Sequence, residues 1–327
     1  MTTSRPTDGR SSDDRRRRRV TRGTADHLRA ADPPAGLRGR NGKVLGVLTG
    51  VPAASHEDVV IADDDVRYDG HGLHAVQLLL RHADLVRPQN YFDPLPWHAH
   101  WDTGRILLNR AVGADFPGTL AVRRSVFLAM GGYDPDVLFE NLELIRTVQA
   151  YGGTVATAAG LYVRRLPPTT RHFCSQRVRQ AYDELAQPLR LVAALLVLPG
   201  VAAAVTARRT GLLAATAAAV VALAETGRRR AGGTRVFSPT TAWVAPLWLL
   251  ERGVCSWLAV GQAVCRGGVR YSGGRLRRAA SPARALRRRL ARTQPTARRP
   301  GAGSAGADAP SRCRLPVPPP GPPALHT

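Results

Sequence analysis

Cysteine and lysine are scarce in this 327-residue chain. Its four cysteines lie far apart and no two are spaced as C-x-x-C, so neither a zinc site nor a disulfide scaffold is indicated. Lys43 is the only lysine, and arginine therefore carries nearly all of the formal net charge of +23. This arginine excess, together with abundant Ala, Gly and Pro, is typical of a GC-rich bacterial genome.

Sequence modules that would direct such a basic chain to nucleic acid are also missing. We find no helix-turn-helix, no zinc finger and no aromatic stacking module, so we expect no nucleic-acid partner. The basic run Arg15 to Arg19 is not followed by an apolar segment, and a secretory signal is therefore not expected. The positive charge instead flanks apolar segments, which favours anionic membrane lipids as partners of the basic tail.

Both ends of the chain are poor in apolar residues. Residues 1–35 combine the arginine run with many Ser, Thr and Asp. Residues 266–327 contain twelve arginines up to Arg299 without one acid, and then a proline-rich end. Neither segment can bury enough apolar surface to offset the entropy lost on ordering. We therefore expect disorder in 1–35 and in 266–327.

Two uncharged apolar runs lie in the second half of the chain. Residues 191–207 are seventeen residues without a charge, and residues 210–224 are fifteen more. Each run is slightly shorter than the roughly 20 residues that cross a bilayer core, and Arg208–Arg209 separates them. We predict a membrane helical hairpin over 188–226. A buried helical pair of a soluble protein is the alternative.

A third apolar segment, residues 236–265, contains three tryptophans and the charged pair Glu251–Arg252. On insertion scales, a charge at the centre of a membrane helix costs about 2.5–3.5 kcal/mol. We therefore expect this segment to lie in the interface or against the hairpin, with Trp243, Trp248 and Trp257 at the level of the headgroups.

Arginines flank the predicted hairpin on both sides. Six lie between residues 164 and 190, and Arg228 to Arg230 with Arg235 follow it. Because positive residues stay on the cytoplasmic side, we expect the preceding domain and the basic tail to lie in the cytoplasm, at the inner cell membrane.

Residues 36–187 alternate short apolar runs with Gly, Pro, Asp and aromatic residues, as an α/β domain does. Within them, residues 59–62 are small or β-branched, which predicts a buried parallel strand. Three carboxylates, Asp63, Asp64 and Asp65, follow where that strand ends. Ligands bind beyond the carboxyl ends of the strands in open α/β sheets, so these acids mark a candidate site.

Asp63 and Asp65 lie two residues apart, so in an extended chain both side chains leave the same face. Two hard oxygen donors on one face suit Mg²⁺ or Mn²⁺, which can in turn hold a diphosphate. An acidic surface turn after a strand is the alternative interpretation of the same residues.

Further motifs accompany these aspartates in a fixed order. They are N-G-K-V at 41–44, D-F-P-G-T-L-A-V-R-R at 115–124, G-G-Y-D at 131–134, L-F-E-N-L-E-L at 138–144 and Q-R-V-R-Q at 176–180. The order resembles that of membrane-associated family-2 glycosyltransferases, in particular the ceramide glucosyltransferase-like branch. That family carries a G-K-x-x-A segment, D-x-D, a small-residue strand, a G-G-[FY]-D turn, an E-D pair and Q-x-x-R-W. The resemblance covers roughly residues 38–275.

The resemblance implies a GT-A-like α/β domain, partly Rossmann-like, over 36–187, followed by C-terminal membrane helices. The implied activity is metal-assisted, inverting transfer of a sugar from a nucleotide-diphosphate sugar to a membrane-associated lipid or lipid-linked glycan. Asp63 and Asp65 would hold the Mg²⁺ or Mn²⁺ ion that neutralises the leaving diphosphate. Glu140, at a helix start, would be the general base that takes the proton of the acceptor hydroxyl.

Four residues are candidates for donor or acceptor binding. By the resemblance, Gln176 and Arg179 lie on an amphipathic helix near the acceptor, where Arg179 can pair with phosphate. Lys43 would reach a phosphate or nucleobase, although a solvated lysine after a glycine turn is the simpler interpretation. Asp64, between the two metal ligands, is assigned to the same group.

The sequence departs from the family pattern at three points. Asn141 replaces the second acid of the E-D pair, which usually carries the catalytic carboxylate, so Glu140 or Glu143 would have to act. Gln180 replaces the tryptophan of Q-x-x-R-W. Only 62 residues precede Asp63, so we expect the first βαβ unit, which grips the nucleobase, to be absent. Slow turnover or none is expected, with Asn141→Asp raising it in a chain that also carries the missing unit.

Two other functions fit parts of the sequence. A non-catalytic, membrane-anchored relic of such a transferase would bind a partner or lipid through its basic tail. A haloacid-dehalogenase-like phosphatase would use residues 59–66 as its nucleophile loop. That chemistry needs a downstream lysine, whereas Lys43 lies upstream.

Overall fold

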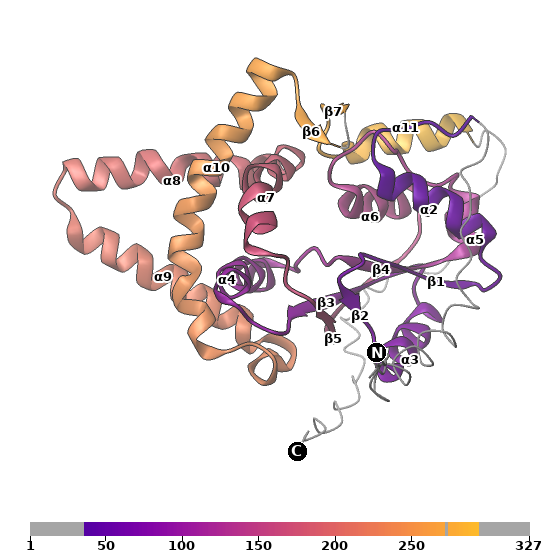
Figure 1. Ribbon diagram of the computed structural model, residues 1–327, viewed down its shortest axis with the longest axis horizontal. Helices are drawn as coiled ribbons and strands as arrows, with labels where there is room; N and C mark the ends of the chain where they lie inside the picture. The colour runs from indigo at the N-terminus through magenta and orange to yellow at the C-terminus, as the bar shows by residue number, and fades with distance from the viewer. Residues whose placement is uncertain (1–35, 272–273, 294–327) are drawn as a thin grey trace, which may run out of the picture.

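The computed structural model describes residues 36–271 and 274–293. Residues 1–35 and 294–327, for which the sequence predicts disorder, lie outside the described residues. Within the described part, a five-stranded sheet with helices on both faces adjoins a group of longer helices (Figure 1). The mixed α/β architecture predicted for the first part of the chain is confirmed.

The sheet is mixed rather than parallel. Its strand order is β1-β4-β3-β5-β2, and only β3 and β5 pair in parallel. The strands are β1 (Asp58–Ala62), β2 (Val66–Arg67), β3 (Leu85–Phe92), β4 (Thr119–Arg123) and β5 (Val155–Arg165). Because β1, β3 and β5 point the same way, their carboxyl ends lie at the same end of the sheet.

The strand before the aspartates differs from the prediction. β1 is not a buried parallel strand: it lies at the edge of the sheet and pairs only with β4, which is antiparallel. No other strand of the described residues pairs with its outer edge. Ile61 is its one buried residue, and Asp58 and Ala62 are exposed. A short β-branched run predicts a strand, but it does not show which neighbours that strand will have.

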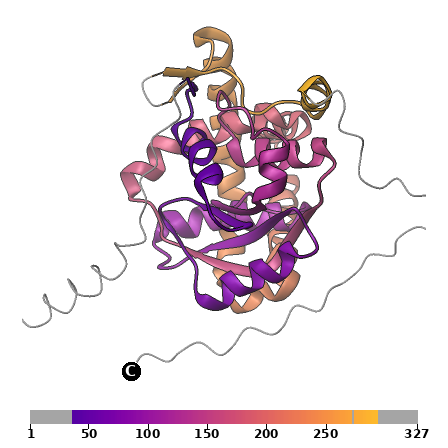
Figure 2. The same cartoon turned by 90° about the vertical axis from the view of Figure 1, so that its right-hand side faces the viewer.

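Helices cover both faces of the sheet (Figure 2). Those that pack on it are α2 (Gly42–Ala53), α3 (Gly70–Leu80), α5 (Arg124–Ala129) and α6 (Glu140–Tyr151). Side chains alternate along β4, so that Leu120 and Val122 pack with α2, α5 and α6, whereas Ala121 packs with α3 on the opposite face. The α6 residues Ile145 and Val148 are buried in the first of these clusters, as their helical spacing predicts.

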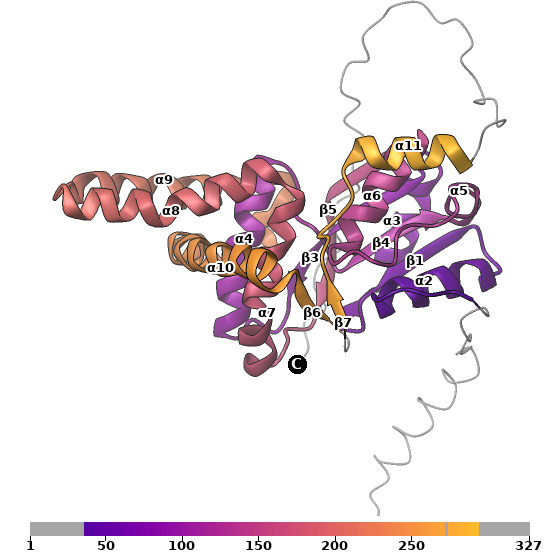
Figure 3. The ribbon, with the colours of Figure 1, turned by 90° about the horizontal axis from the view of Figure 1, so that it is seen from above.

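The longer helices form the second part of the molecule (Figure 3). They are α4 (Trp97–Val112), α7 (Thr170–Tyr182), α8 (Pro188–Thr206), α9 (Thr210–Arg229) and α10 (Ala245–Arg266), with the 3-10 turns η1 (Asp183–Ala186), η2 (Arg230–Arg235) and η3 (Pro239–Val244). α8 and α9 project from the body as a hairpin, and α10 crosses them steeply near its base (Figure 1).

The hairpin helices are long and apolar enough to cross a membrane, judged by length and composition alone. The most apolar stretch of 18 residues within 188–206 has a mean hydropathy of 2.1, and that within 210–235, a range that includes η2, has 1.4. Only 11% of each apolar window is buried within the molecule, so these helices differ from the buried pair of a soluble core. Their insertion into a membrane stays a prediction.

The base of the hairpin is fixed to the rest of the molecule by close backbone contacts. Gly227 of α9 lies so near α4 that a Cβ there would meet the Leu107 carbonyl oxygen at 1.9 Å. The buried Arg110 of α4 donates to the carbonyls of Gly227 (3.0 Å) and Arg230, at the negative end of the α9 dipole. The α9 end of the hairpin is therefore rigidly attached to α4.

Part of the predicted disordered tail is ordered. Residues 266–293 complete α10 and form β6 (Val269–Tyr271), β7 (Gly274–Leu276) and α11 (Ala283–Thr293). Leu276 is buried between α7 and α10, and Leu286 and Leu290 of α11 are buried as well. The prediction of disorder for this segment is therefore wrong. A leucine pair at i and i+4 is enough to seat an arginine-rich helix, and the arginine count obscured it.

Candidate functional site

The carboxylates of Asp63 and Asp65 come together just beyond the end of β1. The chain is not extended there, because the Val66 amide donates to the Asp63 carbonyl (3.1 Å) and closes a turn. Arg165, the last residue of β5, donates from Nη2 to Asp63 Oδ2 (3.2 Å) and from Nε to Asp65 Oδ2 (2.9 Å). One guanidinium therefore joins both carboxylates, which lie on the same side of the turn.

Lys43, on the first turn of α2, joins this pair to Glu140. Its Nζ lies 2.5 Å from Asp63 Oδ1 and 2.9 Å from Glu140 Oε1. Burial lowers the pKa of Lys43, but the carboxylates of Glu140 and Asp63 outweigh burial and raise the pKa, so the side chain stays an ammonium. The one lysine thus contacts a predicted metal ligand and the predicted base at once. We call Lys43, Asp63, Asp65, Glu140 and Arg165 the strand-end cluster.

Gly118, just before β4, closes the strand-end cluster on one side. Its carbonyl accepts from the Asp63 amide (2.8 Å), and its own amide donates to Asn90 Oδ1 (2.7 Å). A Cβ at position 118 would lie 2.6 Å from Asp63 Oδ2 and 3.0 Å from the Arg165 guanidinium carbon. A side chain at this position would therefore have to displace the Asp63 carboxylate or the Arg165 guanidinium.

The carboxylates fit a divalent cation that is shared with a substrate. Asp65 Oδ1 is buried without a hydrogen-bond partner among the described residues, so one oxygen of the pair is available to a ligand. Those residues contain no group of three or more His, Cys, Asp or Glu side chains that would hold a metal by themselves. Two carboxylates with substrate phosphates completing the coordination are an arrangement that Mg²⁺ commonly adopts.

Asp64 and Glu143 lie away from the strand-end cluster, contrary to their predicted roles. Asp64 is exposed, and within the described chain only its carbonyl is bonded, by Arg67 Nη1 (2.6 Å). Glu143 is fully buried on α6 and accepts from the Ser281 amide (2.5 Å), just before α11. Burial raises the pKa of Glu143. Glu143 therefore anchors the segment before α11.

Asn141, which replaces the usual catalytic acid, has a structural contact of its own. Its Nδ2 donates to the Pro117 carbonyl (2.8 Å), next to Gly118. The amide therefore holds the loop that closes the strand-end cluster, a role that a carboxylate could not fill.

Gln176 and Arg179 lie beside the strand-end cluster rather than within it. Arg179 Nη1 donates to Gln176 Oε1 (2.7 Å), and its guanidinium lies 4.6 Å from the centre of the Tyr271 ring. Both residues line a groove between α7, the end of α10 and the β6–β7 hairpin. The structure thus separates these two predicted substrate-binding residues from the carboxylates.

Asp183, in η1, is electrostatically coupled both to Glu140 in the strand-end cluster and to Arg179 in the groove. Its Oδ1 is buried and has no hydrogen-bond partner in the described part of the chain. Burial raises the pKa of Asp183 to about 8, and the charge of Glu140 acts in the same direction, whereas Arg179 opposes it. Asp183 therefore carries a proton at neutral pH. Nothing in its local sequence distinguishes it from a surface acid.

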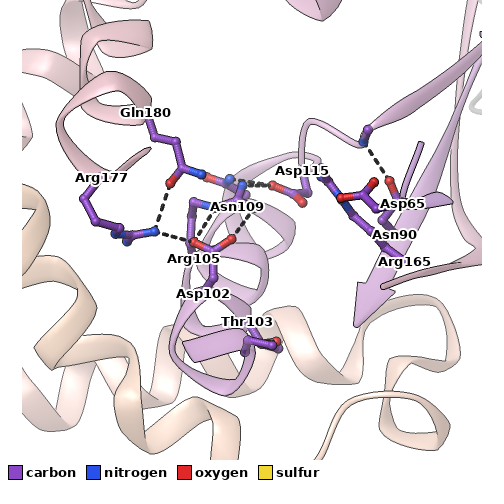
Figure 4. A network of polar contacts seen from close by, with 12 residues as sticks. Asp65, Asn90, Asp102, Thr103, Arg105, Asn109, Asp115, Arg165, Arg177 and Gln180 are labelled. Carbon is purple, nitrogen blue, oxygen red and sulfur yellow. Dashed lines mark hydrogen bonds and ion pairs between the residues drawn. The ribbon is translucent and has the colours of Figure 1, made fainter. Parts of the chain in front are cut away.

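A second set of charges, which we call the helix network, joins α4, α7 and α10 (Figure 4). Its members are Asp102, Arg105, Asn109, Asp115, Arg177, Gln180 and Glu251. Arg177 donates to Asp102 Oδ1 (3.1 Å) and to Glu251 Oε1 (2.5 Å). Burial opposes ionisation of Asp102, but Arg105 and Arg177 outweigh it and hold the pKa of Asp102 below its usual range. Arg177 is therefore the structural residue of the Q-R-V-R-Q motif.

The charged pair within α10 faces protein rather than lipid. Glu251 meets Arg177 as described, and Arg252 lies 3.6 Å from Glu184 in η1. Trp248 is buried under the Arg252 guanidinium (4.9 Å), so its predicted position among the headgroups is wrong. Trp243 and Trp257 are exposed, although Trp243 lies in η3 and not in α10.

Arg165 and Asn90 are the site residues that the sequence did not reveal. Asn90 lies near the carboxyl end of β3 and Arg165 at the carboxyl end of β5, at the same end of the sheet as the carboxyl end of β1. An arginine that ends a strand would have been a useful signal only if the strand order had been known. The pairing of β5 with β3 was not deducible from the local pattern.

No family model matches the chain, and no curated protein matches it. Among solved structures, the chain is similar to the mannosyltransferase PcManGT from Pyrobaculum calidifontis in complex with GDP-Man and Mn²⁺. The identity is 18% and the TM-score is 0.44, over 75% of this chain and 74% of that one. At this level, the similarity assigns no activity, ligand or metal to this chain.

Proposed function

We propose that the chain is a glycosyltransferase that takes a sugar from a nucleotide-diphosphate donor. The observation that supports this most is the convergence of Asp63 and Asp65 on one guanidinium at the carboxyl edge of the sheet, with Glu140 joined to them through Lys43. Carboxylates placed at this edge point towards a ligand, and their spacing suits a cation-bound diphosphate.

Each residue of the strand-end cluster has a distinct part in this proposal. Asp63 and Asp65 would hold Mg²⁺ or Mn²⁺, which would neutralise charge developing on the leaving diphosphate. Lys43 and Arg165, which neutralise the carboxylates in the free protein, are placed to turn to the donor phosphates. Glu140 would accept the proton of the acceptor hydroxyl.

The acceptor in this proposal is a lipid or lipid-linked glycan, and the hairpin crosses the inner cell membrane with the α/β part and the tail in the cytoplasm. The proposed orientation rests on the arginines that flank the hairpin, because Lys and Arg near the ends of membrane helices stay on the cytoplasmic side.

Donor binding tests the proposal directly. The full chain, purified in detergent, is titrated calorimetrically with GDP-mannose and with UDP-glucose in the presence of Mn²⁺, Mg²⁺ or EDTA. We expect binding of one donor that needs the metal, and binding at least about tenfold weaker in Asp65→Ala, because the lost metal ligand should cost at least about 1.4 kcal/mol.

Asp58→Ala is the matched control, because Asp58 is an exposed carboxylate at the far end of the same strand. It should leave donor affinity unchanged. Donor binding that persists in EDTA, or equally in Asp65→Ala, would remove the metal assignment. No binding of any donor by the well-folded protein would favour the relic, a membrane-anchored binding protein without transferase activity.

The same contacts bear on the phosphatase alternative. Lys43 does reach Asp63, although it lies upstream, so sequence order was a poor guide to this contact. Lys43 binds one oxygen of Asp63 and Arg165 binds the other. A nucleophilic carboxylate needs an oxygen free to attack, so phosphatase chemistry at Asp63, like metal binding, requires one of these cations to turn away first.

A further inference from the structure

A groove of about 820 Å³ opens between α7, the C-terminal end of α10 and the β6–β7 hairpin. Among the described residues, four arginines line it: Arg179, Arg266, Arg270 and Arg275. No acid of that part of the chain lines the groove, and its other polar side chains there are neutral, such as Gln176 and Tyr271. We call it the basic groove.

The charges of the basic groove are not neutralised by carboxylates. Arg179 bonds to Gln176 and lies over the Tyr271 ring, and Arg275 Nη1 donates to the Arg266 carbonyl. Across residues 36–271 and 274–293, none of the four guanidinium groups forms an ion pair with an acid. A cleft lined by one sign of charge attracts counter-charge, and arginine binds phosphate through paired N–H donors.

The basic groove adjoins the strand-end cluster. Tyr271 Oη lies 3.3 Å from Asn41 Oδ1, and Asn41 caps α2 two residues before Lys43. On the other side, burial is the main cause of the raised pKa of Asp183, and the charges of Glu140 and Arg179 both act on the same carboxyl group. A headgroup held in the basic groove would therefore lie beside the candidate base.

An apolar stripe leads along α10 to the same groove. Its large exposed apolar residues recur at helical spacing, and all are at least 38% exposed: Leu247, Leu250, Val254, Trp257, Leu258 and Val264. This spacing places them along one side of the helix. Val264 and Arg266 lie in the same last turn of α10, on different sides of the helix, and Arg266 lines the groove. The exposed apolar surface of α10 therefore ends at the same level along the helix as the positive charge of the groove.

We infer that the basic groove binds the phosphate of a lipid acceptor whose hydrocarbon chain lies along the exposed stripe of α10. That the ligand is an acceptor rests on the proposed function. The phosphate is argued from the groove, and the hydrocarbon chain from the exposed stripe of α10. It assigns substrate-binding roles to Arg266, Arg270 and Arg275, which the sequence placed in a disordered tail. Arg179 joins them because it reaches the groove from α7.

The test uses the full chain in dodecyl maltoside micelles and hexadecyl phosphate as the probe. Binding is measured by calorimetry for the natural chain, for Arg266→Gln/Arg270→Gln and for Arg284→Gln/Arg288→Gln. The last pair removes the same charge from the exposed face of α11. We expect the groove variant to bind at least about tenfold more weakly, because two charge-assisted bonds to phosphate are lost, and the α11 variant to bind like the natural chain.

Two further probes identify what the groove recognises. Hexadecanol should bind much more weakly than hexadecyl phosphate, because it lacks the anion. Inorganic phosphate should bind weakly, because it lacks the chain. Equal affinity for hexadecanol, equal affinity for inorganic phosphate, or equal losses in the two variants would overturn the inference.

The outcome can be separated from that of the proposed function. Asp65→Ala should keep its affinity for hexadecyl phosphate, and the groove variant should keep metal-dependent donor binding. Loss of donor binding with an intact groove would sink the transferase proposal alone. Loss of hexadecyl phosphate binding with intact donor binding would sink the groove assignment alone.

Discussion

Asp63 and Asp65 in the strand-end cluster and Asp102 in the helix network all pair with arginine, yet the two regions differ in burial and in support. The side chains of Asp63, Asp65 and Arg165 are 24–27% exposed, whereas those of Asp102 and Arg177 are 8% and 9% exposed. The first set lies on a turn and at a strand end. The second lies on the middle turns of packed helices.

This difference indicates which charges can exchange partners. A partly exposed ion pair contributes at most about 1 kcal/mol, so a ligand can replace it at little cost. A buried pair cannot lose one partner without leaving an uncompensated charge in a medium of low polarity. The same residue types therefore form a binding site in one region and a fixed helix contact in the other.

The largest effect is expected from breaking the helix network. Arg177→Ala leaves Glu251 and Asp102 with less compensation between α7, α4 and α10, and should lower the free energy of unfolding by about 3–5 kcal/mol. Urea unfolding in detergent measures this loss. Arg171→Ala, which removes an exposed arginine of the same helix, should change stability by less than about 0.5 kcal/mol. If Arg177→Ala is stable and loses only donor binding, Arg177 contacts a ligand. The helix network would then not differ from the strand-end cluster in this respect.

A smaller effect is expected at the rim of the strand-end cluster. Asn141→Asp replaces the donor to the Pro117 carbonyl by an acceptor and should lower the free energy of unfolding by about 1–3 kcal/mol. Asn141→Ala, which removes the donor without adding charge, should cost less. If Asn141→Asp is as stable as the natural chain and transfers sugar faster, the side chain is free to leave Pro117 and act as the base, as the family pattern predicts.

Over a single pH unit, the smallest effect is the pH dependence contributed by Asp183. Its pKa is raised to about 8, so the native state keeps a proton that the unfolded state loses above the ordinary pKa of about 4. Stability should therefore fall as pH rises from about 4 to 8, by up to about 1.4 kcal/mol per pH unit, and level off above that.

Asp183→Asn should flatten this dependence, because the amide does not titrate. Urea unfolding of both forms between pH 5 and pH 8 measures the difference. Parallel curves for the two forms would show that Asp183 is already ionised in the native state, and that water or a ligand reaches its carboxyl group.

Elements with a strong periodic pattern were predictable from the sequence. The helix at 140–151, the apolar hairpin helices and the strand before the aspartates are all present, because local spacing fixes which face of an element is apolar. The order of strands was not predictable in this way. β1 lies at an edge and pairs antiparallel to β4, and that pairing depends on contacts between segments about 60 residues apart along the chain.

The acidic residues of the candidate site were predictable from the sequence, whereas the contacts of its arginine and lysine residues were not. Asp63, Asp65 and Glu140 were found because acids at strand ends and helix starts mark sites. Arg165 was missed since its neighbours in space are remote in sequence. Lys43 was found as a candidate donor contact, but its ion pairs with Asp63 and Glu140 were not predicted, because a lone lysine after a glycine turn does not show which acids it will meet.

The arginine-rich tail shows most clearly which properties follow from the local sequence and which depend on tertiary packing. Composition determined that this segment is basic. Only the tertiary structure decided that its first part would fold, because Leu276 packs between α7 and α10, and α11 packs on α6 with Leu286 and Leu290 buried. Sequence fixes the chemistry and the period of each segment, since both are local. Which charges meet, and whether they face a ligand or one another, depends on distant segments being brought together by packing.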